Sequence, residues 1–212
     1  MILKRVQGVV LLVAVLVSSA VLGQDTPVEP TAEQLRKAKD DYAKVGGTYE
    51  AVTDPLTKRV THSFYFRNTT RDADLKNLPN PPFPFMLNLW NTQVTDAGLK
   101  ELKELKNLTT LYLGSTKVTD AGLKELKELK NLTSLGLDYT KVTDAGLKEL
   151  KELKELKNLT TLYLVETKVT DAGLKELKEL KNLTTLNLFL TKVTDAGLKE
   201  FREALPKCKI LR

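Results

Sequence analysis

The sequence predicts an α/β repeat fold, a solenoid with short parallel strands on its concave face and short helices on its convex face. The first reason is a hexapeptide, Val-Thr-Asp-Ala-Gly-Leu, that begins at Val94 and returns at spacings of 24, 24, 27 and 24 residues. Its later copies begin at Val118, Val142, Val169 and Val193. A period of roughly 20–50 residues is the signature of a stacked array. The second reason is the Leu-x-x-Leu-x-Leu run after each copy, such as Leu108–Leu113, whose last two leucines alternate as in a strand.

These motifs resemble the leucine-rich repeat family. The hexapeptide and its copies are similar to repeats of bacterial, planctomycete-type members and to the ribonuclease-inhibitor-like repeats attached to F-box proteins. The resemblance covers roughly residues 60–212. It implies a leucine-rich repeat solenoid whose concave face is the usual recognition surface, and it indicates a bacterial source. Because the family is defined by its scaffold, the resemblance does not name a ligand.

The N-terminal residues have the layout of a secretory signal peptide. Lys4 and Arg5 precede an apolar run from Gly8 to Val17, and small residues follow at Ser18–Ala20. The apolar run is shorter than the ~20 residues that span a bilayer comfortably. We therefore expect an exported protein, periplasmic or secreted. The alternative is an uncleaved N-terminal anchor, and only in that case is the membrane a partner.

Net charge and cysteine content narrow the classes of partner. Loss of Lys4 and Arg5 with the signal peptide lowers the formal net charge from +6 to +4, which is not the balance of a nucleic-acid-binding protein. Cys208 is the only cysteine, so no disulfide can form within the chain. The predicted organisation is a signal peptide (1–23), a linker (24–30), an N-terminal helix-and-hairpin cap with a degenerate repeat (31–86), leucine-rich repeats (87–205) and a C-terminal cap (206–212).

The N-terminal cap begins with a predicted helix over 31–45. Thr31 can cap it, Gln34 completes a capping box, and Gly46 and Gly47 end it. Two β-prone runs, 49–52 and 60–66, then flank a turn and predict a hairpin. The second run also has the register of a worn repeat. The four prolines that follow exclude a helix there, namely Pro79, Pro81, Pro82 and Pro84.

Within a repeat, residue types indicate their places. Leu123, Leu126 and Leu129 recur every third residue, which predicts a short helix with 3₁₀ character. The aspartate of the hexapeptide suits the start of that helix, where it can accept a backbone N–H. The expected structural aspartates are Asp96, Asp120, Asp144, Asp171 and Asp195. A threonine after each strand stands where the family usually has Asn or Cys, and we expect its hydroxyl to bond the adjacent turn in a ladder along the solenoid. These threonines are Thr92, Thr116, Thr140, Thr167 and Thr191.

Two features mark departures from the regular repeat. The third unit carries an extra Lys-Glu-Leu triplet, near 150–152, which we expect to lengthen only the convex helix of that unit. After Leu205 the pattern ends, and Ile210 falls in strand register, so it is predicted to close the sheet.

Differences between the copies indicate the binding residues. The units agree nearly everywhere except at the outward positions of the strand and just after it, which predicts one patch on the concave face. Its residues are Trp90, Tyr112, Asp138, Tyr163, Asn187 and Phe189. A row of exposed aromatic residues with an acid among them resembles a protein-binding surface. The alternative is that recent duplication left identical copies, and that drift appeared first where packing imposes nothing.

Other constellations favour structure over chemistry. Lysine and glutamate rows on the convex helices favour a solvated face, because the glutamates cancel most of the lysine field. One aspartate per unit lacks the convergent partners of a metal site. His62 and Cys208 lie in opposite caps, so no catalytic triad can be built. We expect no catalytic residues, no metal and no cofactor.

The sequence therefore predicts an exported, non-catalytic interaction module that binds a protein or peptide through its concave face. Two alternatives stay open. One is an envelope-associated structural protein that uses its charged convex face or an N-terminal anchor. The other is an inhibitor or sensor subunit for a secreted enzyme.

Overall fold

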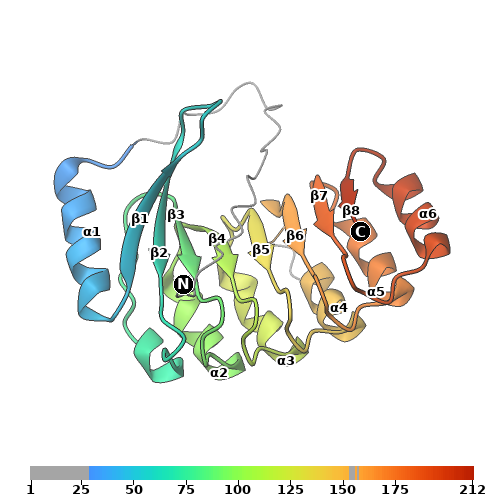
Figure 1. Cartoon of the computed structure of the whole chain (residues 1–212), viewed down its shortest axis with the longest axis horizontal. Coiled ribbons are helices and arrows are strands. Elements are labelled where there is room, and N and C mark those ends of the chain that lie inside the picture. The colour runs from blue at the N-terminus through green and yellow to red at the C-terminus, as the bar shows by residue number, and fades with distance from the viewer. Residues whose placement is uncertain (1–28, 153–155, 157) are drawn as a thin grey trace, which may run out of the picture.

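The computed structural model describes residues 29–152, 156 and 158–212 and shows stacked units in a curved array (Figure 1). The predicted signal peptide, 1–23, and most of the predicted linker lie outside the described residues. Within the described part, one eight-stranded sheet follows the order of the chain. Its strands are β1 (Thr48–Thr53), β2 (Val60–Tyr65), β3 (Phe85–Asn88), β4 (Leu108–Tyr112), β5 (Ser134–Gly136), β6 (Thr161–Tyr163), β7 (Thr185–Asn187) and β8 (Lys209–Leu211).

The sheet is parallel from β2 to β8, and β1 pairs with β2 in the antiparallel sense. Short helices return the chain from each strand to the next and lie on the outer side of the arc (Figure 1). They are η1 (Asp72–Leu75), α2 (Asp96–Leu99), η2 (Lys100–Glu104), α3 (Asp120–Leu123), η3 (Lys124–Glu128), α4 (Asp144–Glu152), α5 (Asp171–Glu176), η5 (Leu177–Glu179) and α6 (Asp195–Ala204). The predicted repeat architecture is confirmed.

The helices also confirm the predicted 3₁₀ character. A single α-turn, such as α3, passes directly into a 3₁₀ segment, such as η3, because leucines at every third residue face one side only in the tighter helix. The third unit differs in that its α4 is one α-helix of nine residues, where α2–η2 and α3–η3 divide the same length into four α and five 3₁₀ residues. Leu135 pairs with Leu162 across the 27-residue spacing, so the extra triplet leaves the strand register intact.

One apolar column runs through the whole sheet. Phe64 pairs with Leu87 at the N-terminal end, Leu111 with Leu135 in the middle, and the column ends at Ile210. The central leucines have no exposed surface. Each buried leucine contributes roughly 1.5–3 kcal/mol, but only when a neighbouring unit covers it. The fold is therefore held by contacts between units.

The hexapeptide locks adjacent units together. Asp120 accepts the backbone N–H of Thr143 at 2.7 Å and its hydroxyl at 2.7 Å, 23 residues further on. The same carboxylate lies so close to Gly146 that a Cβ there would be 2.4 Å from its Oδ1. The same lock repeats as Asp72–Thr95–Gly98, Asp96–Thr119–Gly122, Asp144–Thr170–Gly173 and Asp171–Thr194–Gly197. One threonine and one glycine are thus fixed by the aspartate of the preceding unit.

This arrangement corrects the predicted role of the repeated aspartates. They do not cap their own helices: Thr119 is the N-cap of α3, and its hydroxyl accepts from Ala121 N–H. The helix in its own unit is already capped by threonine, so the carboxylate is free to reach the next unit. Asp195, in the last unit, forms an ion pair with Arg212 instead.

The second threonine column also differs from expectation. The Thr116 hydroxyl donates to the Leu113 carbonyl in its own unit at 2.6 Å, and Thr92, Thr140, Thr167 and Thr191 do the same. These bonds close the turn after each strand, so they do not form the predicted ladder. Other threonines form it: Thr133 donates to the Thr109 carbonyl, and Thr160 to the Thr133 carbonyl.

Both ends of the sheet are covered. Helix α1 (Ala32–Lys44) has the predicted capping box of Thr31 and Gln34. It lays Tyr42 on Phe64 with ring centroids 3.8 Å apart, which covers the first unit. The predicted hairpin is β1 and β2. At the other end β8 carries Ile210 in register and closes the sheet as predicted, beside α6.

Candidate functional site

Parallel pairing places the predicted binding residues in two rows on the strand face. The first row crosses the strands at Asn88, Tyr112, Gly136, Tyr163 and Asn187. The second row lies two residues further along the chain, just past the end of each strand, and consists of Trp90, Gly114, Asp138, Val165 and Phe189. Backbone hydrogen bonds between units continue past the strand ends, as from Leu89 N–H to the Tyr112 carbonyl, so the alternation continues and both rows belong to one surface. We call them the inner row and the outer row.

The exposure of these residues differs from the expected row of exposed aromatics. Trp90 and Phe189 are exposed, at 40% and 51%. Tyr163 and Asp138 are buried instead, at 7% and 8%. Tyr112 and Asn187 are half-buried, and Asn187 accepts the N–H of Phe189 at 3.1 Å. The face therefore consists of a partly covered floor with exposed apolar residues toward its two ends.

Two glycines determine how the aromatic rings lie. Trp90 covers Gly114, where a Cβ would be 2.1 Å from the ring, and continues to an edge contact with Tyr139 at 5.9 Å between centroids. Tyr112 covers Gly136 in the same manner and meets Tyr163 edge-on at 6.2 Å. Each ring fills the space that the missing side chain leaves, so each aromatic pair spans three successive units.

Asp138 lies in this cluster. Its Oδ1 accepts the backbone N–H of Val165 at 2.7 Å. Burial raises the pKa of Asp138 to about 6. Hydrogen bonds from the backbone N–H groups of Val165 and of Asp138 itself act in the opposite direction and lower it. Burial is also the main cause of the raised pKa of Tyr112 and Tyr163, and the Asp138 charge contributes to both. Tyr163 reaches about 12.

A third column follows the outer row. Asn91, Ser115, Tyr139, Glu166 and Leu190 all have positive φ, between 52° and 58°. Tyr139 and Leu190 are exposed, at 47% and 60%, and sequence reasoning left them out of the binding set. A signal was present, because both positions differ between the copies. Both residues lie in a turn with positive φ, so strand alternation did not predict that Tyr139 contacts Trp90.

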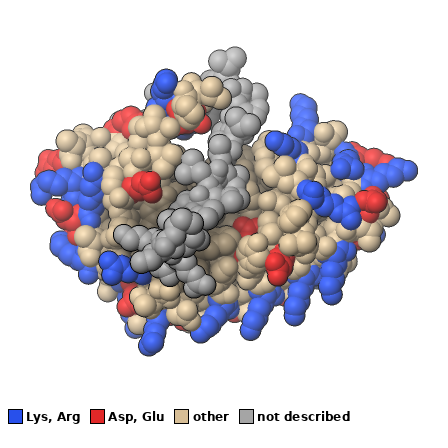
Figure 2. Space-filling model, in the orientation of Figure 1, with Lys and Arg blue, Asp and Glu red and all other residues tan. Residues whose placement is uncertain are grey.

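The helical side is charged, whereas the strand face is largely uncharged. Figure 2 shows Lys and Arg side chains projecting along the lower edge, where Figure 1 places the helices. Lysines of one unit pair with glutamates of the next: Lys106–Glu128, Lys124–Glu149, Lys151–Glu176 and Lys178–Glu200, at 2.8–3.5 Å. Such pairing between units favours a solvated surface over a continuous cationic field.

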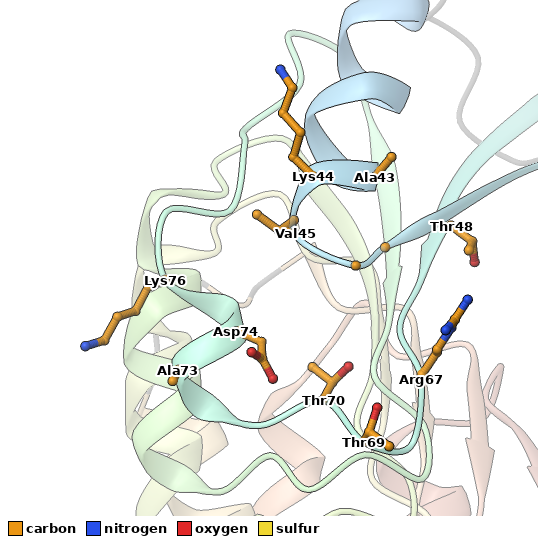
Figure 3. A pocket seen from close by; sticks show the side chains of 12 residues that line it. Ala43, Lys44, Val45, Thr48, Arg67, Thr69, Thr70, Ala73, Asp74 and Lys76 are labelled. Atoms are coloured by element: carbon orange, nitrogen blue, oxygen red, sulfur yellow. The ribbon is translucent and has the colours of Figure 1, made fainter.

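A shallow hollow of about 760 Å³ lies between the end of α1 and the turn that precedes η1 (Figure 3). Its cations do not converge: Lys44 and Lys76 point away from it, and Lys44 pairs with Asp41 at 2.9 Å. Asp74 accepts the N–H of Arg71 and so fixes the local turn. Its lining residues include one carboxylate, Asp74, and no histidine or cysteine.

The residues considered for chemistry are far apart. His62 lies in β2 beside Tyr49, whose hydroxyl is 2.8 Å from its Nδ1, and Cys208 precedes β8 at the opposite end of the sheet. Burial raises the pKa of Cys208 to about 11, which disfavours the reactive thiolate. In the described part of the chain, no three His, Cys, Asp or Glu residues are grouped closely enough to hold a metal ion.

None of the helices described has the length and apolar character that crossing a bilayer requires.

The geometry places the protein in the class of solenoids whose units each contribute a parallel strand and a short helix. A family model described as Leucine Rich repeat matches residues 104–127, 155–178 and 179–201. The matched units are leucine-rich repeats. Leucine-rich repeat domains commonly mediate protein–protein interaction and are typically non-catalytic. The planctomycete-type variety of the repeat stays a prediction.

Several solved structures are similar to this chain. They include an internalin (inlF) from Listeria monocytogenes, at 26% identity over 59% of this chain with a TM-score of 0.48. A leucine-rich repeat protein from Leptospira interrogans has 27% identity over 59% of this chain and a TM-score of 0.45. The matched parts are 34% and 36% of those two chains, so the similarity spans about a third of their length. An internalin C2 (inlC2) from Listeria monocytogenes has 21% identity, covers 91% of this chain and 88% of its own, and has a TM-score of 0.46. A search of the curated proteins found no match.

Proposed function

We propose that this chain is an exported, non-catalytic module that binds a protein or peptide through its strand face. The observation that carries the proposal is a set of four exposed apolar residues along one edge of that face. They are Trp90, Tyr139, Phe189 and Leu190, each 40–60% exposed. Exposed aromatic and aliphatic side chains that line one edge are typical of protein-binding surfaces. Export rests on the signal-peptide layout of residues 1–23.

Backbone conformation argues against drift as the origin of this edge. Tyr139 and Leu190 adopt φ of 56° and 58°, where a bulky residue costs about 1–2 kcal/mol. The first repeat has Asn91 at the same position, a residue that tolerates this region. Because Tyr139 and Leu190 gain little burial in return, a ligand is the better explanation for their presence.

Replacing Leu190 with asparagine should separate stability from binding. We expect the free energy of unfolding to rise by about 0.5–1 kcal/mol, because asparagine tolerates positive φ and the lost side chain is 60% exposed. Ligand binding should weaken at the same time. Urea denaturation measures the first quantity. A loss of stability would mean that Leu190 packs in solution and would remove this support.

The direct test compares two variants of the full chain. One carries Trp90→Ser, Tyr139→Ser, Phe189→Ser and Leu190→Asn. The matched control carries four substitutions on the helical side, Lys100→Ser, Lys124→Ser, Lys148→Ser and Lys199→Ser. After circular dichroism shows equal folding, the wild-type chain and both variants are immobilised and offered envelope and secreted proteins of the source organism. We expect wild type and control to retain the same protein and the strand-face variant to lose it. The reverse pattern, with steep salt dependence, would instead support the envelope-associated alternative.

A further inference from the structure

Asp138 is the one charged side chain in the inner and outer rows, and it is 8% exposed. Throughout the described residues, no lysine, arginine or histidine forms an ion pair with it. A carboxylate buried without a cation is unfavourable, because water no longer solvates its charge. Tyr112 and Tyr163 lie within electrostatic reach of Asp138, and neither carries a positive charge that could offset the charge of the carboxylate.

The fold does not require this charge. The structural task of Asp138 is to accept the N–H of Val165 through Oδ1. On the same face, Asn88 and Asn187 accept backbone N–H groups through neutral amide oxygens, at 2.9 and 3.1 Å. An asparagine at 138 would therefore satisfy the same donor without burying a charge. Among the described residues, no other residue donates a hydrogen bond to the second oxygen, Oδ2.

We propose that the Asp138 carboxylate binds the guanidinium group of an arginine on a protein or peptide ligand, beside the rings of Tyr112 and Tyr139. This inference rests on the proposed function and specifies which chemistry the strand face recognises. An arginine N–H would donate to Oδ2, and the guanidinium plane would lie on an aromatic face. Guanidinium is more weakly hydrated than ammonium, which suits a site that is largely closed to water.

The arrangement of the rings supports the same assignment. Trp90 bridges two units to contact Tyr139, the residue after Asp138, and Tyr112 bridges two units to contact Tyr163. The carboxylate therefore lies between two aromatic pairs. Aromatic faces carry negative potential, so they attract a cation and repel a second carboxylate. An arginine satisfies both the charge and the ring faces.

The first test uses a defined probe, the peptide acetyl-Gly-Gly-Arg-Gly-Gly-amide, added to the full chain. Trp90 is the only tryptophan, so its fluorescence reports on this cluster. We expect a saturable change with the arginine peptide and at least tenfold weaker binding of the same peptide with neutral citrulline. Asp138→Asn should weaken the arginine peptide at least tenfold. Glu203→Gln, which removes one exposed carboxylate from α6, should leave the affinity unchanged. Equal affinity for citrulline, unchanged binding by Asp138→Asn, or no response up to the solubility limit of the peptide would each overturn the inference.

The second test separates this inference from the proposed function. The protein retained by the wild-type chain is offered to Asp138→Asn and to the four-substitution strand-face variant. If the strand-face variant loses the protein and Asp138→Asn keeps it, strand-face recognition stands and the arginine inference is wrong. If the strand-face variant also keeps it, the proposed function is wrong, whatever the peptide does. Loss by both variants, together with tenfold selectivity for the arginine peptide, supports both.

Discussion

Replacing Gly146 with alanine is expected to lower the free energy of unfolding by about 2–3 kcal/mol. The new Cβ would lie 2.4 Å from Oδ1 of Asp120, so the carboxylate must move. It is held there by the N–H and the hydroxyl of Thr143, and moving it breaks charge-assisted hydrogen bonds between two units. The clash therefore makes this substitution more destabilising than a glycine-to-alanine substitution usually is. Urea denaturation followed by circular dichroism measures the change.

A double-mutant cycle identifies the cause. In an Asp120→Ala background the carboxylate is gone, and Gly146→Ala should become close to neutral: alanine exceeds glycine in helix propensity by about 1 kcal/mol, which offsets the contacts of the new Cβ with methyl groups of Leu123 and Val142 at 3.0 Å. The expected coupling energy between the two sites is therefore about 2–3 kcal/mol. Ala145→Gly, at the exposed neighbouring position in α4, measures the propensity effect alone. Additive effects would show that Gly146 is not fixed by the preceding unit.

The fold was predictable because a repeat specifies its own register. Once Leu111 and Leu135 are recognised as equivalent, their pairing in adjacent strands follows, and the structure confirms it. The threefold leucine spacing was equally informative about the short helices. The 27-residue spacing between β5 and β6 followed from counting the extra triplet. These predictions depend on backbone geometry and burial, which the order of residue types determines.

The hydrogen-bond partners of the repeated aspartates could not be predicted. The identity of the repeats, which made the fold predictable, is the cause. Every unit carries an identical aspartate and threonine, so a bond within a unit and a bond to the next unit have the same sequence pattern. The structure decides between them: Asp96 reaches Thr119 of the following unit at 2.7 Å. Only the glycine of the hexapeptide indicated the contact. A helical position with ordinary backbone angles does not require glycine unless another group approaches it closely.

The placement of the six predicted residues on one face could be predicted from the sequence, whereas their exposure could not. The two rows follow from strand alternation, and the structure shows all six predicted residues on one face. Their exposure depends on how rings fold over Gly114 and Gly136, which is a matter of side-chain packing. The covered Asp138 and the exposed Tyr139 both result from this packing. Residue differences between the copies predicted the location of the variable surface. They could not predict which of its side chains remain exposed.

The buried carboxylate gives the other large expected effect. We expect Asp138→Asn to raise the free energy of unfolding at pH 8 by at most about 3 kcal/mol, which corresponds to the rise in pKa from 3.8 to about 6. Below about pH 3.8 the carboxyl is protonated in both the folded and the unfolded chain, so the variant gains nothing. Between about pH 3.8 and 6 the unfolded chain ionises while the folded chain keeps its proton. Wild-type stability is therefore lost relative to the variant as pH rises through this window, and the difference is constant above it.

Denaturation of wild type and Asp138→Asn at a series of pH values between 3 and 8 measures this difference. Asp171→Asn is the control with the opposite sign, because hydrogen bonds from Thr194 lower the pKa of Asp171. That variant should be less stable at neutral pH, and its deficit should shrink as pH falls through the ordinary aspartate range. A difference between wild type and Asp138→Asn that does not change with pH would mean that the carboxylate is solvated in the folded chain. A gain in stability that accompanies loss of arginine binding would instead show that the charge at 138 weakens the fold and serves the ligand, since the neutral amide satisfies everything else that contacts it.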